Sequence, residues 1–214
     1  MRIVASIVTA FTFAFIAAAW GDDAAKTYKV DDEGYVRNWL ILEPVKLTED
    51  VSGHDEEHEK PVFDKDWVKA DHRPAAGDKL KVGGKELTWV AKEVEQPVAD
   101  FTEIFADKEH EQCLFLGVFY VVADKDIENV KLSIGSDDSS VWRVNGKEVI
   151  RVYAGRDYDK DTDKSQPLTL KKGINIVELA VTQGDGPSGA VARFLDKNDK
   201  PVRDIRISLT PPAK

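Results

Sequence analysis

The chain has 214 residues, with 30 Lys and Arg against 39 Asp and Glu, and its formal net charge is −9. A length of this order favours one domain, and a hydrophobic content of 42% excludes a wholly disordered chain. The acidic balance argues against a nucleic-acid or anionic-membrane partner, because both attract clustered Lys and Arg. The single cysteine cannot form an internal disulfide.

The first residues are typical of an export signal. Residues 3–19 carry no charge, follow Met1-Arg2 and lead into Ala19-Trp20-Gly21. A positive start, an apolar run and small residues before a polar stretch indicate a secretory signal peptide rather than an uncleaved anchor. We therefore expect residues 1–21 to be removed after Gly21, and the mature chain to lack a membrane span. Without paired cysteines, a bacterial envelope is the better fit, so the expected location is secreted or periplasmic.

The first half of the mature chain shows weak strand signals separated by polar segments. Residues 22–34 are polar and are predicted to form a linker, and residues 36–42 form the first predicted strand. Residues 47–86 are acidic and interrupted by glycines and prolines, which predicts a long acidic loop. A short strand is expected at 87–91. Residues 98–108 are the best helix candidate, because their apolar residues have helical spacing.

The second half is richer in strand signals. Residues 113–123 are almost continuously apolar, which favours a strand covered on both faces, and residues 130–134 alternate. Asn145-Gly146 predicts a hairpin, because both central residues of such a turn need positive φ. Further strands are expected at 168–170, 174–182, 190–195 and 202–209. The pattern predicts an all-β, jelly-roll-like β-sandwich over residues 35–210, with at most one short helix and a tail at 211–214.

Three segments resemble those of galactose-binding-like jelly rolls. They are the Trp-bearing strand and its end at 36–44, Gly135 to Asp138 with Val144-Asn145-Gly146-Lys147 after it, and Leu170 to Asn175. Glu43 stands where the first segment usually has a glycine. The Asp-Asp turn and the Asn-Gly-Lys turn also resemble the protective-antigen-type sandwich of yeast flocculins and some glycosidases. Either resemblance implies an accessory module that binds sugars or has a structural role, often with calcium.

The resemblance to the flocculin modules implies that Asp137 and Asp138 are calcium ligands beside a sugar. Adjacent carboxylates offer the hard oxygens that Ca²⁺ requires. The alternative is a turn pair that accepts hydrogen bonds from nearby backbone N–H groups. A second acidic set alternates along residues 157–163, but it lacks the central glycine and the terminal glutamate of an EF-hand, so a solvated loop is expected there.

Aromatic rings can stack on the C–H faces of sugars, and this chemistry selects the candidate ligand-binding residues. They are Tyr153, Arg156, Tyr158 and Trp67, with the arginine suited to a carboxylated sugar and the tryptophan lying in a polar stretch. Trp142 alternates with Val144 and is instead predicted to pack in the core.

Signals for catalysis are weak. His54 to His58 matches the inverted zinc-peptidase pattern H-x-x-E-H, but Gly53 precedes it, Pro61 follows it, and no apolar face would hold a helix in place. Cys113 opens the most apolar strand and is predicted to be an inert buried thiol. Neither a G-x-S-x-G elbow nor a phosphate-binding glycine loop occurs in the sequence.

We therefore expect an exported, non-catalytic carbohydrate-binding module whose partner is a polysaccharide or glycan, with calcium as its candidate cofactor. The alternative is an envelope structural or protein-interaction domain without a sugar site, with other envelope proteins as partners.

Overall fold

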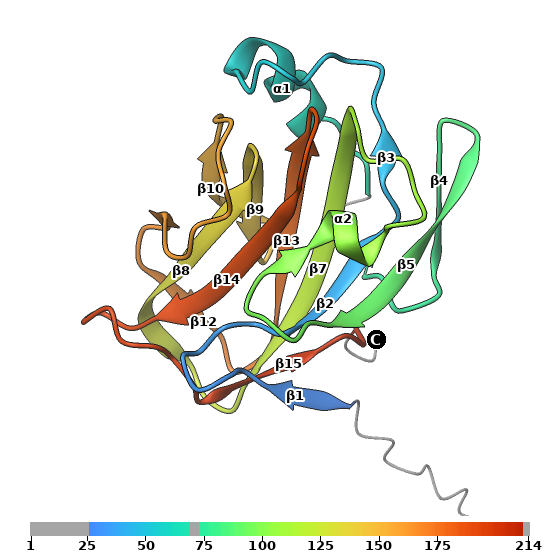
Figure 1. Ribbon diagram of the computed structural model, residues 1–214. Helices are drawn as coiled ribbons and strands as arrows, with labels where there is room; N and C mark the ends of the chain where they lie inside the picture. Colours follow the sequence, from blue (N-terminus) through green and yellow to red (C-terminus); the bar gives the residue numbers. More distant parts are fainter. Residues whose placement is uncertain (1–25, 69–72, 212–214) are drawn as a thin grey trace, which may run out of the picture.

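The computed structural model describes residues 26–68 and 73–211, so the predicted signal peptide lies outside the described residues. The described chain forms two antiparallel sheets that pack face to face, as Figure 1 shows. The first sheet has ten strands, with the main path β10-β9-β13-β7-β2-β5-β4, and the second has five, with the path β11-β8-β14-β6. The predicted all-β sandwich is confirmed.

The strands of the first sheet are β1 (Thr27–Lys29), β2 (Asn38–Leu42), β3 (Val45–Lys46), β4 (Lys79–Val82), β5 (Lys85–Glu93), β7 (Cys113–Ala123), β9 (Ser140–Val144), β10 (Lys147–Val152), β13 (Gly173–Gln183) and β15 (Ile205–Ser208). The strands of the second sheet are β6 (Ala99–Asp100), β8 (Ile127–Asp137), β11 (Asp163–Lys164), β12 (Leu168–Leu170) and β14 (Gly189–Leu195).

The centre of the first sheet is the pairing of β7 with β13. The two strands run antiparallel along their full length, from Gly173 opposite Ala123 to Gln183 opposite Cys113. Because most side chains of β7 are buried, its sequence needs no alternation. Trp142 lies in the core with its ring centroid 6.4 Å from that of Trp39, in an edge-on arrangement that suits aromatic quadrupoles.

The predicted hairpin is present between β9 and β10. Asn145 has φ of 52° and Gly146 has φ of 76°, which is the backbone that the Asn-Gly turn was expected to require. Asn145 also donates from Nδ2 to Asn175 Oδ1 at 2.9 Å, which ties the turn to the start of β13. This hairpin marks the end of β9, and the Asp137-Asp138 turn lies at the opposite end of the same strand.

The structure has two short helices in its described part, where the sequence predicted at most one. Helix α2 (Phe101–Ile104) falls inside the expected 98–108 segment and is shorter than expected. Helix α1 (Glu56–Phe63) falls inside the predicted acidic loop 47–86. It forms because Asp55 caps its N-terminus, accepting from the His58 backbone N–H at 3.0 Å, and because acidic residues occupy its first turn.

Two other segments are more ordered than the sequence predicted. The predicted loop 47–86 also contains β4, which pairs with β5. The predicted linker 22–34 contains β1, where Tyr28 lies opposite Ile207 of β15. β1 has three residues and β4 has four, and β4 lies among the glycines of the predicted loop, so neither gives a strand signal long enough to predict. Among the described residues, the helices are too short and too polar to cross a membrane.

Candidate functional site

Asp137 ends β8 and Asp138 lies in the turn that joins β8 to β9, and both residues are buried. Their exposed fractions are 6% and 7%, and the peptide bond between them is cis. Ser188 donates from Oγ to the Asp137 carbonyl at 2.9 Å, and Ser136 donates from Oγ to the Asp138 carbonyl at 2.8 Å. Serines from β8 and from the loop before β14 therefore satisfy the main chain of the turn.

The two side-chain carboxyl groups share a hydrogen bond, and burial makes it costly to ionise both of them. Asp138 accepts from the Arg156 backbone N–H at 3.1 Å, while its Oδ2 lies 3.5 Å from Nε2 of His54. Burial, followed by the nearby charges of Asp138 and Asp157, raises the pKa of Asp137 to about 7. Burial also raises the pKa of Asp138. The protein stabilises the ionised forms of these two aspartates poorly, and a bound cation would stabilise them.

The segment after β10 brings Arg156 and Tyr158 to the same turn. Arg156 donates from Nε to the Ser136 carbonyl at 3.1 Å, and its Nη1 pairs with Asp163 at 2.6 Å, so its guanidinium is engaged with protein. Tyr158 packs on Gly189, where an added Cβ would lie 3.1 Å from the ring. Burial, followed by Asp100, Asp137 and Asp157, raises the pKa of the Tyr158 hydroxyl, which places this half-buried ring beside the acidic turn.

The other two candidate ligand residues lie near α1. Tyr153 packs against Phe63 of α1, with ring centroids 6.1 Å apart, and accepts from Arg151 Nη1 at 3.0 Å. Trp67 donates from Nε1 to the Val62 carbonyl at 2.7 Å, and Lys65 Nζ lies 3.9 Å from its ring centroid. Trp67 lines a cavity of about 290 Å³ against the first sheet rather than the Asp137-Asp138 turn.

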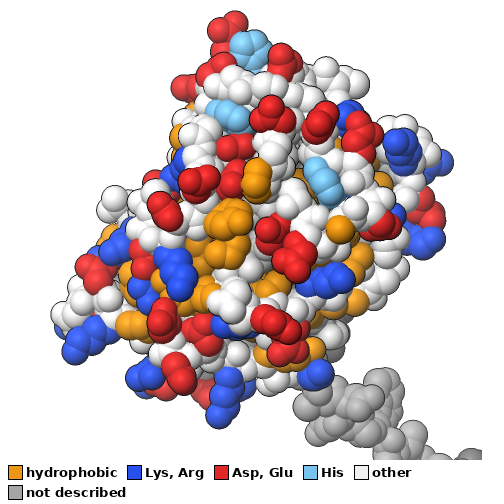
Figure 2. Space-filling view, viewed as in Figure 1, with side chains coloured by type: hydrophobic (Ala, Val, Ile, Leu, Met, Phe, Trp, Pro, Cys, Tyr) orange, Lys and Arg blue, Asp and Glu red, His pale blue; other side chains and the backbone are white. Residues whose placement is uncertain are grey.

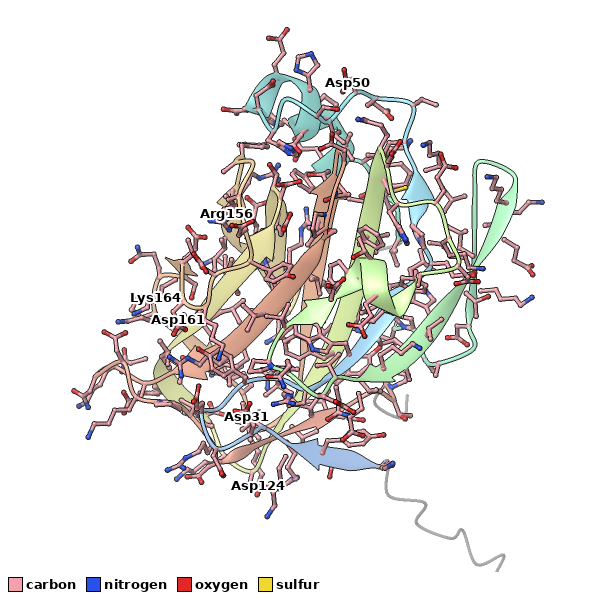
Figure 3. All side chains as sticks on the ribbon, in the orientation of Figure 1. Asp31, Asp50, Asp124, Arg156, Asp161 and Lys164 are labelled. Carbon is pink, nitrogen blue, oxygen red and sulfur yellow. The ribbon has the colours of Figure 1, made fainter. Side chains whose placement is uncertain are left out.

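Figures 2 and 3 show the surroundings of this site. In Figure 2, acidic and basic side chains border a hydrophobic patch on the face where β8 and β14 run. In Figure 3, Arg156, Asp161 and Lys164 follow one another along one edge of the sandwich, below α1. The candidate site is therefore an acidic loop end with a half-buried tyrosine, and we name the set Asp137, Asp138, Arg156 and Tyr158 the acidic turn site.

The second acidic set is partly structural, contrary to the solvated loop that the sequence predicted. Asp161 accepts from Arg193 Nε at 2.9 Å and from Ser133 Oγ at 2.7 Å, and Asp163 pairs with Arg156. Asp157 and Asp159 remain exposed, as expected of a solvated loop. The reason for the difference is that β11 pairs with β8, which brings Asp161 against Arg193 of β14 and Asp163 against Arg156 of the segment after β10.

The H-x-x-E-H residues do not assemble a zinc-peptidase site. His54 lies outside α1 and faces Asp138, whereas His58 lies on the exposed side of α1 and contacts Asp55 at 2.9 Å. The two imidazoles therefore do not converge on one point, as the chemistry requires. Cys113 is buried, and burial raises the pKa of its thiol to about 11, which keeps it protonated.

Sequence reasoning missed His54 and Glu59 as neighbours of the acidic turn site. Glu59 is fully buried, accepts from Thr182 Oγ1 at 2.6 Å and lies 3.7 Å from His54 Nδ1. No pattern signals this contact, because both residues lie in a polar segment without periodicity. An aspartate such as Asp55 is a common helix N-cap, and this feature of the sequence could have predicted where α1 begins.

Calcium suits the donor chemistry of the acidic turn site. Ca²⁺ takes six to eight oxygen ligands, and the turn offers two adjacent carboxylates. Gln183 Oε1, at the end of β13 where Asp138 N–H meets the Thr182 carbonyl, is buried without a hydrogen-bond partner. Within residues 26–68 and 73–211, no three His, Cys, Asp or Glu side chains are grouped as a metal site. The remaining ligands would therefore be main-chain or amide oxygens, water or a ligand hydroxyl.

Comparisons with known proteins give distant structural similarities only. No protein-family model and no curated protein sequence matches the chain. A β-glucosidase from Kluyveromyces marxianus in complex with glucose is 17% identical, with a TM-score of 0.39 over 60% of this chain and 16% of that one. The Epithelial Adhesin 9 A domain from Candida glabrata, in complex with Galb1-4GlcNAc, is 11% identical, with a TM-score of 0.40 over 87% and 91%.

A beta-glucuronidase from an uncultured Clostridium is 15% identical, with a TM-score of 0.34 over 79% of this chain and 31% of that one. This chain thus spans a small part of both enzymes. Similarities at this level say nothing about the function of this chain.

Proposed function

We propose that this protein is an exported, non-catalytic glycan-binding module whose sugar site is the acidic turn site and whose cofactor is calcium. The observation that supports it most is the pairing of Asp137 and Asp138, both more than nine-tenths buried, without a Lys or Arg side chain bonded to either carboxylate among the described residues. A divalent cation would neutralise this charge. A cation with open coordination positions could then bind vicinal hydroxyl oxygens of a sugar.

Tyr158 would supply the apolar contact of this site. Its ring is half-buried beside the aspartates, and its edge rests on the Gly189 backbone, so it is held in place before a ligand arrives. Preorganised aromatic rings lose little conformational entropy on binding. Calcium would supply charge and oxygen coordination, while the ring of Tyr158 would cover the C–H face of the sugar.

A second function is favoured by a separate observation. The guanidinium of Arg156, the ring of Tyr153 and the indole N–H of Trp67 are all used by contacts inside the protein. This leaves Tyr158 as the one candidate aromatic at the acidic turn site. Among the described residues, an acidic turn site with a single candidate aromatic ring fits an envelope structural or protein-interaction domain, whose partners would be other envelope proteins.

A glycan array distinguishes the two functions. The full chain is applied once with calcium and once with a chelator, beside the variants Asp137→Asn, Tyr158→Ala and Tyr28→Ala. Tyr28 is the matched control, because it is also a half-buried tyrosine but lies on β1, at the other end of the molecule in Figure 1. Calcium-dependent binding that the first two variants lose and the third keeps supports the proposal. No binding to any glycan in either condition contradicts it and favours the interaction domain.

A further inference from the structure

Helix α1 is connected to the acidic turn site through His54. The imidazole lies between two carboxylates: its Nδ1 is 3.7 Å from Glu59 Oε1, and its Nε2 is 3.5 Å from Asp138 Oδ2. Glu59 is anchored in turn by Thr182 of β13, which donates from Oγ1 at 2.6 Å. The segment that precedes α1 thus contacts the acidic turn site through the His54 side chain.

The position of the imidazole is fixed from several sides. Its ring packs directly on the main chain of Gly155, where an added Cβ would lie 2.7 Å from His54 Cδ2. The side chain is only 16% exposed, and its Nδ1 is buried without a hydrogen-bond partner. The His54 backbone has φ of 50°, and its N–H donates to the Val51 carbonyl at 3.3 Å. The ring therefore has little freedom to turn away from Asp138.

The contact with His54 matters for Asp138 because it involves the carboxylate oxygen that the Arg156 N–H does not bind. Oδ1 accepts from the Arg156 backbone N–H at 3.1 Å, and Oδ2 faces the imidazole. The 3.5 Å approach of the imidazole is a contact and not a hydrogen bond, but a packed ring beside Oδ2 limits rotation of the carboxylate, and outer contacts of this kind orient metal ligands. Without His54, the Arg156 N–H and the hydrogen bond with the Asp137 carboxyl would still restrain this side chain, but nothing would face Oδ2 from the side of α1.

We propose that His54 is a positioning residue for the calcium site, orienting the Asp138 carboxylate and so coupling helix α1 to calcium affinity. This inference rests on the proposed calcium-dependent function. His54 does not touch the ion in this account. It acts on Asp138 alone, while Glu59 and the Gly155 backbone hold its ring in the required orientation.

The chain offers two independent ways to remove this contact and one matched control. His54→Asn deletes the imidazole with a residue that tolerates positive φ. Gly155→Ala changes neither His54 nor any carboxylate in the sequence, but its Cβ must displace the His54 ring. The φ of Gly155 lies outside the left-handed region, so alanine can adopt this backbone. His58→Asn is the control, because His58 is exposed and, within the described part of the chain, its ring pairs with the Asp55 carboxylate alone.

Titration calorimetry with calcium chloride measures the affinity of the full chain and its three variants. Because loss of an outer partner weakens metal binding by about 10–100-fold, His54→Asn and Gly155→Ala should both show a decrease of this order. His58→Asn should bind as tightly as the unsubstituted chain. Melting temperatures in chelator are recorded beside the titrations, since a purely structural role would lower them without changing calcium affinity.

The outcomes separate this inference from the function on which it rests. Calcium binding that is equal in all four proteins overturns the role of His54 and leaves the calcium site intact. A lower melting temperature in chelator with unchanged affinity overturns it in the same way. If the unsubstituted chain binds no calcium, the proposed cofactor and the role of His54 both fall.

Discussion

Replacing Asp137 by asparagine should stabilise the calcium-free protein at neutral and alkaline pH. Asp137 is 6% exposed and lies beside Asp138 and Asp157, so its ionised form is disfavoured by burial first and by the neighbouring charges second. Asparagine keeps the size and the polar oxygen of the side chain and removes the charge. Calcium-free conditions matter, because a bound cation would reverse the sign by stabilising the carboxylate.

The magnitude follows from the difference between the folded and unfolded pKa values. Burial and the adjacent acids raise the folded pKa of Asp137 to about 7. Against an unfolded value of about 3.9, this shift of roughly 3 units corresponds to about 4 kcal/mol. Because the pKa of Asp137 is higher in the folded than in the unfolded chain, its contribution to the free energy of unfolding is fully present below about pH 4. This contribution is lost as the pH rises through about 7. Asp137→Asn should remove this dependence.

Urea denaturation in chelator, from about pH 4 to about pH 8, measures the effect as the free energy of unfolding. The unsubstituted chain should lose stability over this range relative to the variant, and the two curves should approach each other at the acidic end. Saturating calcium should then restore the free energy of unfolding of the unsubstituted chain near pH 8 and leave that of Asp137→Asn unchanged. Curves that stay parallel at every pH would refute the account of the buried charge.

Two further predictions concern the structure around the site. Asp161→Asn should destabilise the protein by about 2 kcal/mol near pH 7, because it weakens a hydrogen-bonded pair with Arg193 while asparagine still tolerates the φ of 61°. Burial alone would raise the pKa of Asp161, but hydrogen bonds from Arg193, Ser133 and Tyr35 hold it below its usual value. The loss of stability in Asp161→Asn should therefore shrink as the pH falls through that lowered pKa. A loss of stability that grows in acid would contradict this. Gly135→Ala should cost about 1–3 kcal/mol in urea denaturation, because its Cβ would lie 1.9 Å from the Asp159 carbonyl oxygen. Gly117→Ala, which meets the end of the Leu179 side chain, is the comparison variant, and an equal or larger loss there would argue against the backbone clash.

The strands of the second half could be predicted because their signals are local. The apolar run 113–123 coincides with β7 in every residue, and the Asn145-Gly146 dipeptide forms the expected turn. A covered strand needs no alternation, and a two-residue hairpin needs positive φ, so both features are encoded within a few residues. Trp142 was assigned to the core by the same local alternation, and it is fully buried.

Helix α1 and the contacts of the acidic turn site were not predictable in the same way. The α1 sequence EEHEKPVF buries only Glu59, Val62 and Phe63, so it lacks the apolar stripe that identifies most helices. His54 and Asp138 meet only because α1 packs over the ends of β9 and β13. Such a contact joins two polar segments that are far apart in the sequence, and neither segment carries a periodic signal for it.

A crystal structure of the full chain equilibrated with calcium and a glycan selected on the array would test the central claim most directly. The account predicts a calcium ion bound by carboxylate oxygens of both Asp137 and Asp138, with a sugar hydroxyl among its ligands and the sugar ring against Tyr158. An aspartate pair that binds only protein groups in such crystals, with the glycan elsewhere or absent, would contradict it.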